Sequence, residues 1–209
     1  MRHRSFCPFV AAVFVLVSLC LTTVGWAKDD TLRVGISEEP RTLNIWLASD
    51  ANSRKVMSLI YQPLYTRDPE TLRLSPWLAE SLPVYDSENI SYTVKLRPAK
   101  WADGTEVTAD DVVFTVNLIQ KFKVPRYYSK WSFVRKVEAL DSKTVRFFLE
   151  EPKAIFATRT LINYIVSRQE WESLAKQAEK QENPLKALVN TKIDHPLGCG
   201  PFVLEDWKE

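Results

Sequence analysis

The first residues that could do chemistry are a cysteine and a histidine four positions apart, Cys199 and His195. A cysteine acts as a nucleophile when a nearby histidine takes its proton and an Asn or Asp orients that histidine. No Asn or Asp is convincingly placed to orient His195. We therefore interpret Cys199 as a small buried thiol in a tight turn, and a nucleophilic role is the alternative.

Asp110 and Asp111 are a second candidate, because paired carboxylates can act as acid and base. Adjacent residues point in different directions on a helix, however, and do not face each other. Both follow Thr108, the expected first residue of a capped helix, where Asp111 completes a shortened capping box and the helix dipole favours negative charge. The pair is better explained as a helix cap than as a catalytic dyad.

Cofactor and metal sites are not indicated by the sequence. A zinc site takes about four ligands, whereas residues 28–209 contain one Cys and one His. There is no G-x-S-x-G elbow and no Walker sequence. Gly198-Cys199-Gly200 is followed by Pro201 and an expected strand rather than by a helix whose N-terminus could hold phosphate. We expect no catalytic residue, no metal and no cofactor.

Residues 1–27 have the pattern of a signal peptide. Arg2 and Arg4 precede an apolar run from Phe9 to Leu21, and the small-residue site Gly25-Trp26-Ala27 follows. The run is shorter than the roughly 20 residues of a membrane-spanning helix. We expect cleavage after Ala27 and export to the periplasm. The alternatives are a membrane anchor and a lipoprotein acylated on Cys20, although Leu19 is bulky for such a site.

The charge balance excludes an electrostatic nucleic-acid binder. Removing Arg2 and Arg4 with the leader leaves 26 basic and 26 acidic residues, hence a net charge of 0. Such a chain with interspersed signs has no basic footprint for DNA, RNA or an anionic membrane. With 45% hydrophobic residues it can form a packed core.

Hydrophobic periodicity and turn residues predict a mixed α/β order of elements. Strands are expected at 32–36, 92–96, 134–139, 144–149 and 202–204. Helices are expected at 53–61, from Thr108 to before Pro125, and at 169–181, with a helical turn at 77–80. The closing strand has no partner after it, which predicts an incomplete chain.

Short motifs in this order resemble those of the family 5 (peptide-type) solute-binding proteins of ABC importers. The strongest block comprises Tyr92–Arg97, Trp101–Thr105 and Thr108–Phe114, a strand, an Asp-Gly turn and a capped helix in the family's order and spacing. Five further short matches are spread along the rest of residues 28–209: Leu32–Asn44, Ile60–Leu64, Pro76–Ser81, Ile165–Glu172 and Gly198–Phe202. The sequence departs from the family's pattern at Asn44, Ile45, Ser167, Gln169 and Cys199.

The resemblance implies a periplasmic-binding-protein-like fold of class II with two lobes, of which only first-lobe portions are present. Residues 28–60 and 192–209 would be parts of the first lobe, and 61–191 its extra subdomain. The second lobe would be absent.

By position in that fold, Trp46, Ser49, Asp50 and Ala51 would line the ligand cleft. Trp46 would supply an apolar wall, and Asp50 with nearby backbone groups would hydrogen-bond an extended ligand. The alternative for Asp50 or Asn52 is that it caps the helix starting near Ser53.

The implied function is binding of a solute, most simply an oligopeptide, for an inner-membrane ABC permease, by a monomer without enzymatic activity. Nickel chelates, haem and oligosaccharides are also carried within the family. The alternatives are a non-transport remnant or sensor partner and, less favoured, a secreted hydrolase.

Overall fold

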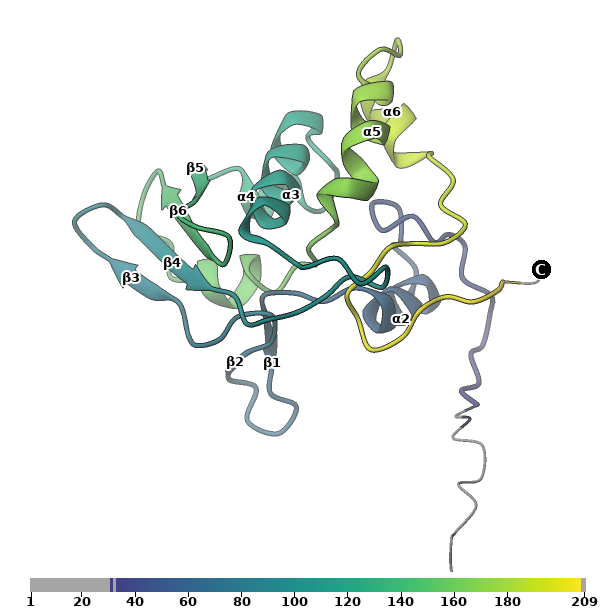
Figure 1. Ribbon diagram of the computed structural model, residues 1–209, viewed down its shortest axis with the longest axis horizontal. Coiled ribbons are helices and arrows are strands. Elements are labelled where there is room, and N and C mark those ends of the chain that lie inside the picture. The colour runs from purple at the N-terminus through teal and green to yellow at the C-terminus, as the bar shows by residue number, and fades with distance from the viewer. Residues whose placement is uncertain (1–30, 32, 208–209) are drawn as a thin grey trace, which may run out of the picture. The chain divides into compact units, whose positions relative to one another are not determined.

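The computed structural model describes residues 31 and 33–207, and the chain from Ser37 onward forms one compact unit. The predicted leader, its cleavage after Ala27 and the alternative lipoprotein residue Cys20 lie outside the described residues. Figure 1 shows the ribbon of the unit, with its helices gathered beside a four-stranded sheet.

The main sheet is antiparallel, with the strand order β3-β4-β6-β5. Its strands are β3 (Val84–Asp86), β4 (Ser91–Lys95), β5 (Val134–Ala139) and β6 (Thr144–Leu149). Side chains alternate between the two faces of a strand, and in β6 this buries Val145, Phe147 and Leu149. The predicted strands at 92–96, 134–139 and 144–149 are confirmed to within one residue. A separate hairpin pairs β1 (Tyr65–Arg67) with β2 (Leu74–Pro76).

Helix α3 (Ala109–Phe122) packs on β5 and β6 through buried residues spaced three and four apart, including Val112, Val116 and Ile119. The predicted capping box is present: the Asp111 carboxylate accepts hydrogen bonds from the backbone N–H and the hydroxyl of Thr108. The helix ends at Lys123 in the left-handed conformation, before Pro125 as predicted.

The described chain contains five further helical elements. They are α2 (Ala51–Ile60), α4 (Tyr128–Trp131), the π-helix η1 (Phe156–Thr160), α5 (Arg168–Ala178) and α6 (Pro184–Val189). Of these, α4 and α5 pack on α3. Helices α3 and α5 lie side by side in Figure 1, and α6 packs on α5. Phe156 of η1 is fully buried against the rings of Tyr92, Trp131, Phe133 and Phe147. This aromatic cluster is the core between the sheet and η1.

Three expected elements are not formed. Residues 33–36 and 202–204 have no strand structure, and Val34, Ile36, Phe202 and Val203 are exposed. A strand needs a second strand beside it, and neither segment pairs with one among the described residues. The predicted helical turn at 77–80 is instead an extended bend, because the Trp77 and Ala79 N–H groups both donate to the Leu64 carbonyl.

The chain returns to α2 after α6. The N–H groups of Gly200 and Phe202 donate to the carbonyls of Ile60 and Leu59, at 2.7 and 3.1 Å. The last carbonyls of a helix have no hydrogen-bond donor within the helix. Here the donors come from a segment that is distant in sequence. The close approach requires glycine: a Cβ at Gly198 would lie 1.9 Å from the Ile60 carbonyl oxygen.

Candidate functional site

The loop that precedes α2 is held in place by Asn44, which is 3% exposed. Its side-chain amide donates to the carbonyls of Leu188, Val189 and Thr191, and its Oδ1 accepts the N–H of Trp46. An Asp here would have no N–H to donate to these carbonyls. Asn44, one of the positions where the sequence departs from the family's pattern, therefore joins the loop to the end of α6.

Trp46 lies in the core. It is 3% exposed, and its ring meets the rings of Tyr127 and Trp171 edge-on, with centroids 5.5 and 5.4 Å apart. Its indole Nε1 is buried without a hydrogen-bond partner among the described residues. Trp46 therefore contributes to the stability of the fold. It is also one of the residues that line a surface hollow described below.

Asp50 is the N-cap of α2, as the alternative interpretation predicted. Its Oδ1 accepts the N–H of Ser53 at 2.8 Å. Hydrogen bonds from Ser53 lower the pKa of the Asp50 carboxyl. Ala51 is the exposed first residue of the helix.

Two of the four predicted site residues meet in one hollow of about 380 Å³, which we call the loop hollow. Trp46 and Ser49 supply one wall, Pro125 and Arg126 a second, and α6 with its flanking asparagines a third. Asp50 and Ala51 do not line it. The loop hollow thus combines three segments that are far apart in the sequence.

A smaller hollow of about 170 Å³ lies beside it, and Arg126 lines both. We call this second one the basic hollow, because Arg54 from α2 and Lys130 from α4 join Arg126 in its lining. Its other lining residues are uncharged: Ile45, Ala48, Met57, Tyr127, Ile162, Asn163 and Tyr164.

Arg126 is held in an uncommon backbone conformation. Its φ is 67°, in the left-handed region that non-glycine residues rarely adopt. Its Nη1 donates to the Ala48 carbonyl at 2.8 Å, which joins the segment after α3 to the loop. Sequence reasoning missed Arg126 and Lys130, because only the folded chain brings them to the loop.

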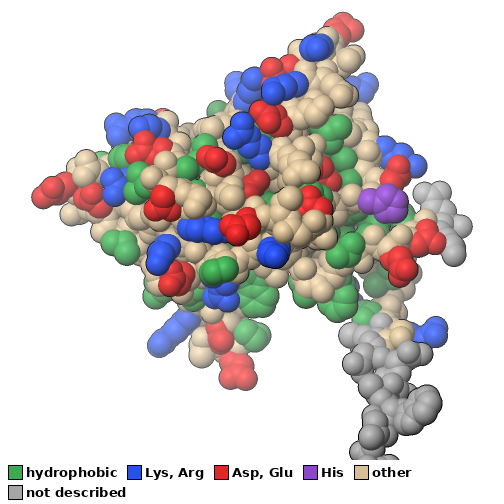
Figure 2. Space-filling view, viewed as in Figure 1, with side chains coloured by type: hydrophobic (Ala, Val, Ile, Leu, Met, Phe, Trp, Pro, Cys, Tyr) green, Lys and Arg blue, Asp and Glu red, His purple; other side chains and the backbone are tan. Residues whose placement is uncertain are grey.

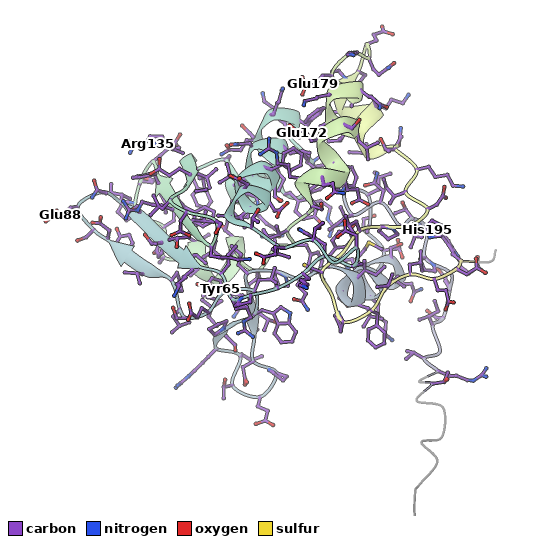
Figure 3. All side chains as sticks on the ribbon, in the orientation of Figure 1. Tyr65, Glu88, Arg135, Glu172, Glu179 and His195 are labelled. Atoms are coloured by element: carbon purple, nitrogen blue, oxygen red, sulfur yellow. The ribbon has the colours of Figure 1, made fainter. Side chains whose placement is uncertain are left out.

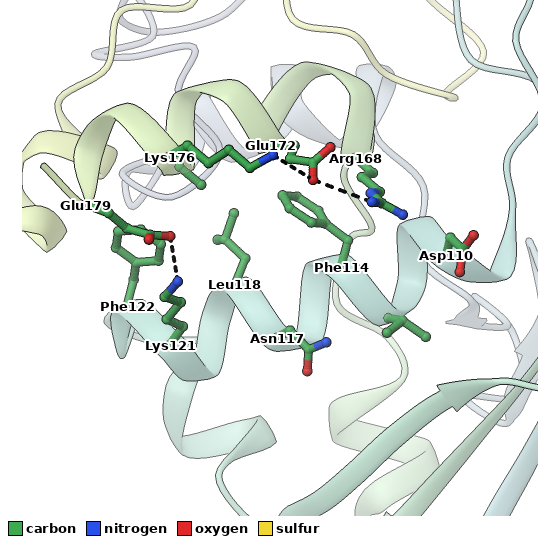
Figure 4. A pocket seen from close by; sticks show the side chains of 12 residues that line it. Asp110, Phe114, Asn117, Leu118, Lys121, Phe122, Arg168, Glu172, Lys176 and Glu179 are labelled. Atoms are coloured by element: carbon green, nitrogen blue, oxygen red, sulfur yellow. Dashed lines mark hydrogen bonds and ion pairs between the residues drawn. The ribbon is translucent and has the colours of Figure 1, made fainter.

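A third cleft, of about 310 Å³, separates α3 from α5 (Figure 4). Phe114, Leu118 and Phe122 project into it from α3. Five of the charged residues that line it form ion pairs: Lys121 with Glu179 at 2.6 Å, and Glu172 with both Arg168 and Lys176. Asp110 lines it as well. This cleft contains none of the four predicted ligand-binding residues.

Cys199 is buried, and burial raises the pKa of its thiol to about 12. A thiolate is therefore scarce at neutral pH. His195 is exposed and lines a different surface hollow, on the segment after α6 (Figure 3). The arrangement supports the interpretation of Cys199 as a buried core thiol.

Glu170 is the most perturbed carboxyl of the described chain. Its Oε1 accepts the N–H of Leu197 at 2.8 Å, and its Oε2 is buried without a hydrogen-bond partner among residues 31 and 33–207. Burial raises the pKa of Glu170 to about 7.

Among the described residues, no group of three or more His, Cys, Asp or Glu side chains is placed to hold a metal ion. In the same part of the chain, none of the helices has the length and apolar character needed to cross a membrane. Figure 2 shows Lys, Arg, Asp and Glu interspersed over the face in view, without a field of one sign.

Comparison with known proteins gives a consistent result. Residues 73–209 match the model of the bacterial extracellular solute-binding proteins, family 5 Middle. The chain is 31% identical to the glutathione-binding protein GsiB of Shigella flexneri over 220 residues, covering 99% of this chain and 37% of that protein. It is 32% identical to the oligopeptide-binding protein AppA of Bacillus subtilis, covering 100% of this chain and 40% of AppA.

Solved structures agree with the sequence relatives. NikZ from Campylobacter jejuni in complex with Ni(L-His) superposes with a TM-score of 0.69 at 25% identity, over 87% of this chain and 34% of NikZ. AppA in complex with a nonapeptide superposes with a TM-score of 0.67 at 29% identity, over 82% of this chain and 33% of AppA. The chain therefore spans about two fifths or less of the length of these relatives, and the mixed α/β architecture is part of their fold.

Proposed function

Because the chain belongs to family 5 of the bacterial extracellular solute-binding proteins, we propose that it contributes the first-lobe part of a solute receptor for an ABC importer. The observation that carries the proposal is the loop hollow, where Trp46 and Ser49 meet Arg126 and α6. The hollow is concave and combines apolar residues, such as Leu185 and Val189, with polar ones, such as Ser49 and Asn190, as ligand sites generally do.

The proposed mechanism is binding without chemistry. In the two-lobed receptors of this family, the lobes close around the solute, and closure is favoured because the ligand binds the closed state more tightly. Residues 28–60 and 192–209 would form one part of the first lobe. The hydrogen bonds from Gly200 and Phe202 to the end of α2 support this pairing of the two segments.

The proposed solute is a short peptide or a similar amino-acid derivative. This follows the relatives, whose names record binding of glutathione and of oligopeptides. Within the loop hollow, the edge of Trp46 offers an apolar surface and the exposed Ser49 hydroxyl a donor and acceptor. Asp50 is occupied by its cap, so the proposed ligand contacts rest on Trp46 and Ser49, with Ala51 exposed nearby.

The proposed setting is outside the inner membrane, with the leader removed after Ala27 and an ABC permease as the partner. The family description, extracellular solute-binding proteins, supports this setting. We further propose that the receptor acts as a monomer and has no enzymatic activity.

The test is to isolate the protein from its native source and identify the solutes released on denaturation by mass spectrometry. Calorimetry with glutathione and with alanine peptides then measures their affinity. Replacing Ser49 with Trp fills the loop hollow and should abolish binding, whereas Ser87→Trp, at an exposed turn between β3 and β4, should not. Equal binding by both variants would remove the loop hollow from the site.

A further inference from the structure

We propose that the basic hollow binds the carboxylate group of the transported solute through Arg54, Arg126 and Lys130. The identity of the solute follows from the proposed function, on which this inference rests. The inference adds a chemical requirement: the end of the solute that enters this hollow carries a carboxylate.

Three cations from three different elements line the hollow. Arg54 comes from α2, Arg126 follows α3, and Lys130 lies in α4. No acidic residue is in the lining. The nearest carboxylate on α2 is that of Asp50, and it accepts the Ser53 N–H of its own helix cap.

None of the three cations has a carboxylate partner in the described part of the chain. The ion pairs there join other residues. Arg126 donates to the Ala48 carbonyl, and Lys130 donates to Oδ1 of Asn163 at 2.7 Å. An arginine has five N–H donors and a lysine three, so most of their donors remain available to a ligand.

Arg126 and Lys130 also repel each other. Burial, and then the Arg126 charge, lower the pKa of the Lys130 ammonium. Both side chains are exposed, so water screens much of this repulsion. An anion placed between them relieves the repulsion and gains charge-assisted hydrogen bonds.

The remaining lining favours an organic carboxylate. Ile45 and Met57 give apolar walls, and Tyr127 and Tyr164 give aromatic ones, suited to the carbon skeleton that carries the charge. The pKa of each tyrosine is raised by burial, so both stay neutral at physiological pH. The hollow is more than ten times the roughly 10–15 Å³ that admits one water molecule.

The left-handed backbone of Arg126 is a second reason to assign it a role. Such strain persists where the surrounding structure determines it, and it is concentrated at binding sites. Here the strained residue places one guanidinium at the boundary of the loop hollow and the basic hollow. In the proposed arrangement, the body of the solute lies in the loop hollow and its carboxylate in the basic hollow, with Arg126 lining both.

The first experiment uses inorganic phosphate as the probe and does not depend on the solute. Thermal unfolding is followed in phosphate and in chloride at equal ionic strength. We compare the unmodified protein with Arg126→Gln/Lys130→Gln and with a charge-matched control, Arg135→Gln/Lys55→Gln. Arg135 is exposed on β5 (Figure 3), and Lys55 is exposed on α2 outside the hollow lining.

We expect the unfolding midpoint of the unmodified protein to be higher in phosphate than in chloride. The control variant should show the same increase, and Arg126→Gln/Lys130→Gln should not. Equal rises in all three proteins would overturn the proposal. An intrinsic stability change in either variant does not affect the comparison, because each protein is its own reference in chloride.

The second experiment is calorimetry with glutathione and with its diethyl ester. Removing both cations should weaken glutathione binding by about tenfold or more, the effect of losing a hydrogen bond to a charged group. The ester should bind the unmodified protein more weakly and should not respond to the substitutions. Equal affinity for acid and ester would overturn the carboxylate assignment. If glutathione does not bind at all, the proposed solute class fails, and the phosphate result still decides the anion site.

Discussion

The carboxylate of Asp111 and the backbone N–H of Arg168 are joined by a hydrogen bond of 2.8 Å across 57 residues of sequence. Asp111 lies in the first turn of α3 and Arg168 in that of α5, so one buried side chain fixes the starting points of two packed helices. The same carboxylate accepts Thr108 N–H and the indole N–H of Trp101. It thus serves as a cap and as a tertiary link.

Replacing Asp111 with Ala should lower the free energy of unfolding by about 3 kcal/mol or more, because several buried donors lose their acceptor together. The neighbouring Asp110 is exposed and makes no such bond, so Asp110→Ala should cost less than about 1 kcal/mol. Urea denaturation of the two variants measures the difference. If both variants lost the same free energy of unfolding, the negative charge in the first turn of α3 would account for the effect, and the buried hydrogen bonds of Asp111 would not.

Replacing Gly198 with Ala should be severely destabilising, by more than about 3 kcal/mol, or should displace the segment after α6 from α2. The added Cβ would lie 1.9 Å from a backbone oxygen that cannot move without disturbing the end of α2. Gly35→Ala is the control, since nothing lies within 4 Å of the added methyl group. Thermal unfolding and limited proteolysis between residues 192 and 207 report the two effects. An unchanged midpoint together with unchanged proteolysis would contradict the close approach.

Replacing Glu170 with Gln should stabilise the protein at pH 8, by up to about 3 kcal/mol. The folded pKa of about 7 exceeds the ordinary value of 4.5, so the folded state binds the extra proton and stability falls as pH rises between these values. Gln keeps an acceptor for the Leu197 N–H and carries no charge, so its advantage should vanish near pH 4.5.

Glu172→Gln provides the contrasting control for Glu170. Hydrogen bonds from Lys176 and Arg168 lower the pKa of Glu172, so its small contribution is present at neutral pH and is lost as pH falls. Solvent screens these exposed ion pairs, so its replacement should destabilise the protein only slightly at pH 8 and should not stabilise it. Chemical denaturation across pH 4.5–8 distinguishes the two. A pH-independent effect at Glu170 would show that burial does not perturb its titration.

Replacing Trp46 with Ala should lower the free energy of unfolding by about 3–5 kcal/mol, because its buried ring is packed between Tyr127 and Trp171. Trp46→Phe keeps one aromatic ring and loses part of the buried ring volume together with an indole N–H that has no partner in the described chain, so its cost should be smaller, about 1–2 kcal/mol. Denaturation curves measure both. Ligand titration of the Phe variant then tests binding without the confounding loss of fold. A destabilisation by Trp46→Ala below about 1 kcal/mol would contradict the core position.

The sequence predicts well those elements whose signals are local. The Thr108–Asp111 cap, the apolar spacing of α3 and the turn between β5 and β6 are all contained within short stretches. The strands expected at 33–36 and 202–204 are not formed, because a strand also needs a second strand to pair with, which hydrophobic periodicity cannot supply. The bend at Trp77 was misjudged for a related reason, because its N–H donates to Leu64 across the chain.

The candidate site was less predictable than the fold. The loop containing Trp46 and Ser49 was located by resemblance, and the capping role of Asp50 by its position before a helix. Arg54, Arg126 and Lys130 carry no motif, since they are ordinary basic residues on three separate elements. Their proximity depends on how α2, α3 and α4 pack, and that information is distributed over the whole core.

The hydrogen bonds from Gly200 and Phe202 to the end of α2 have a consequence for the order of folding. A ribosome delivers the N-terminal end first, so α2 is synthesised well before residues 198–202, whose N–H groups later bond to the carbonyls of Leu59 and Ile60. Contacts between such distant positions carry a large loop-closure cost and slow the search for the native state. We infer that docking of residues 198–202 follows the formation of α3 and the sheet. Until these residues dock, the end of α2 remains accessible to a chaperone.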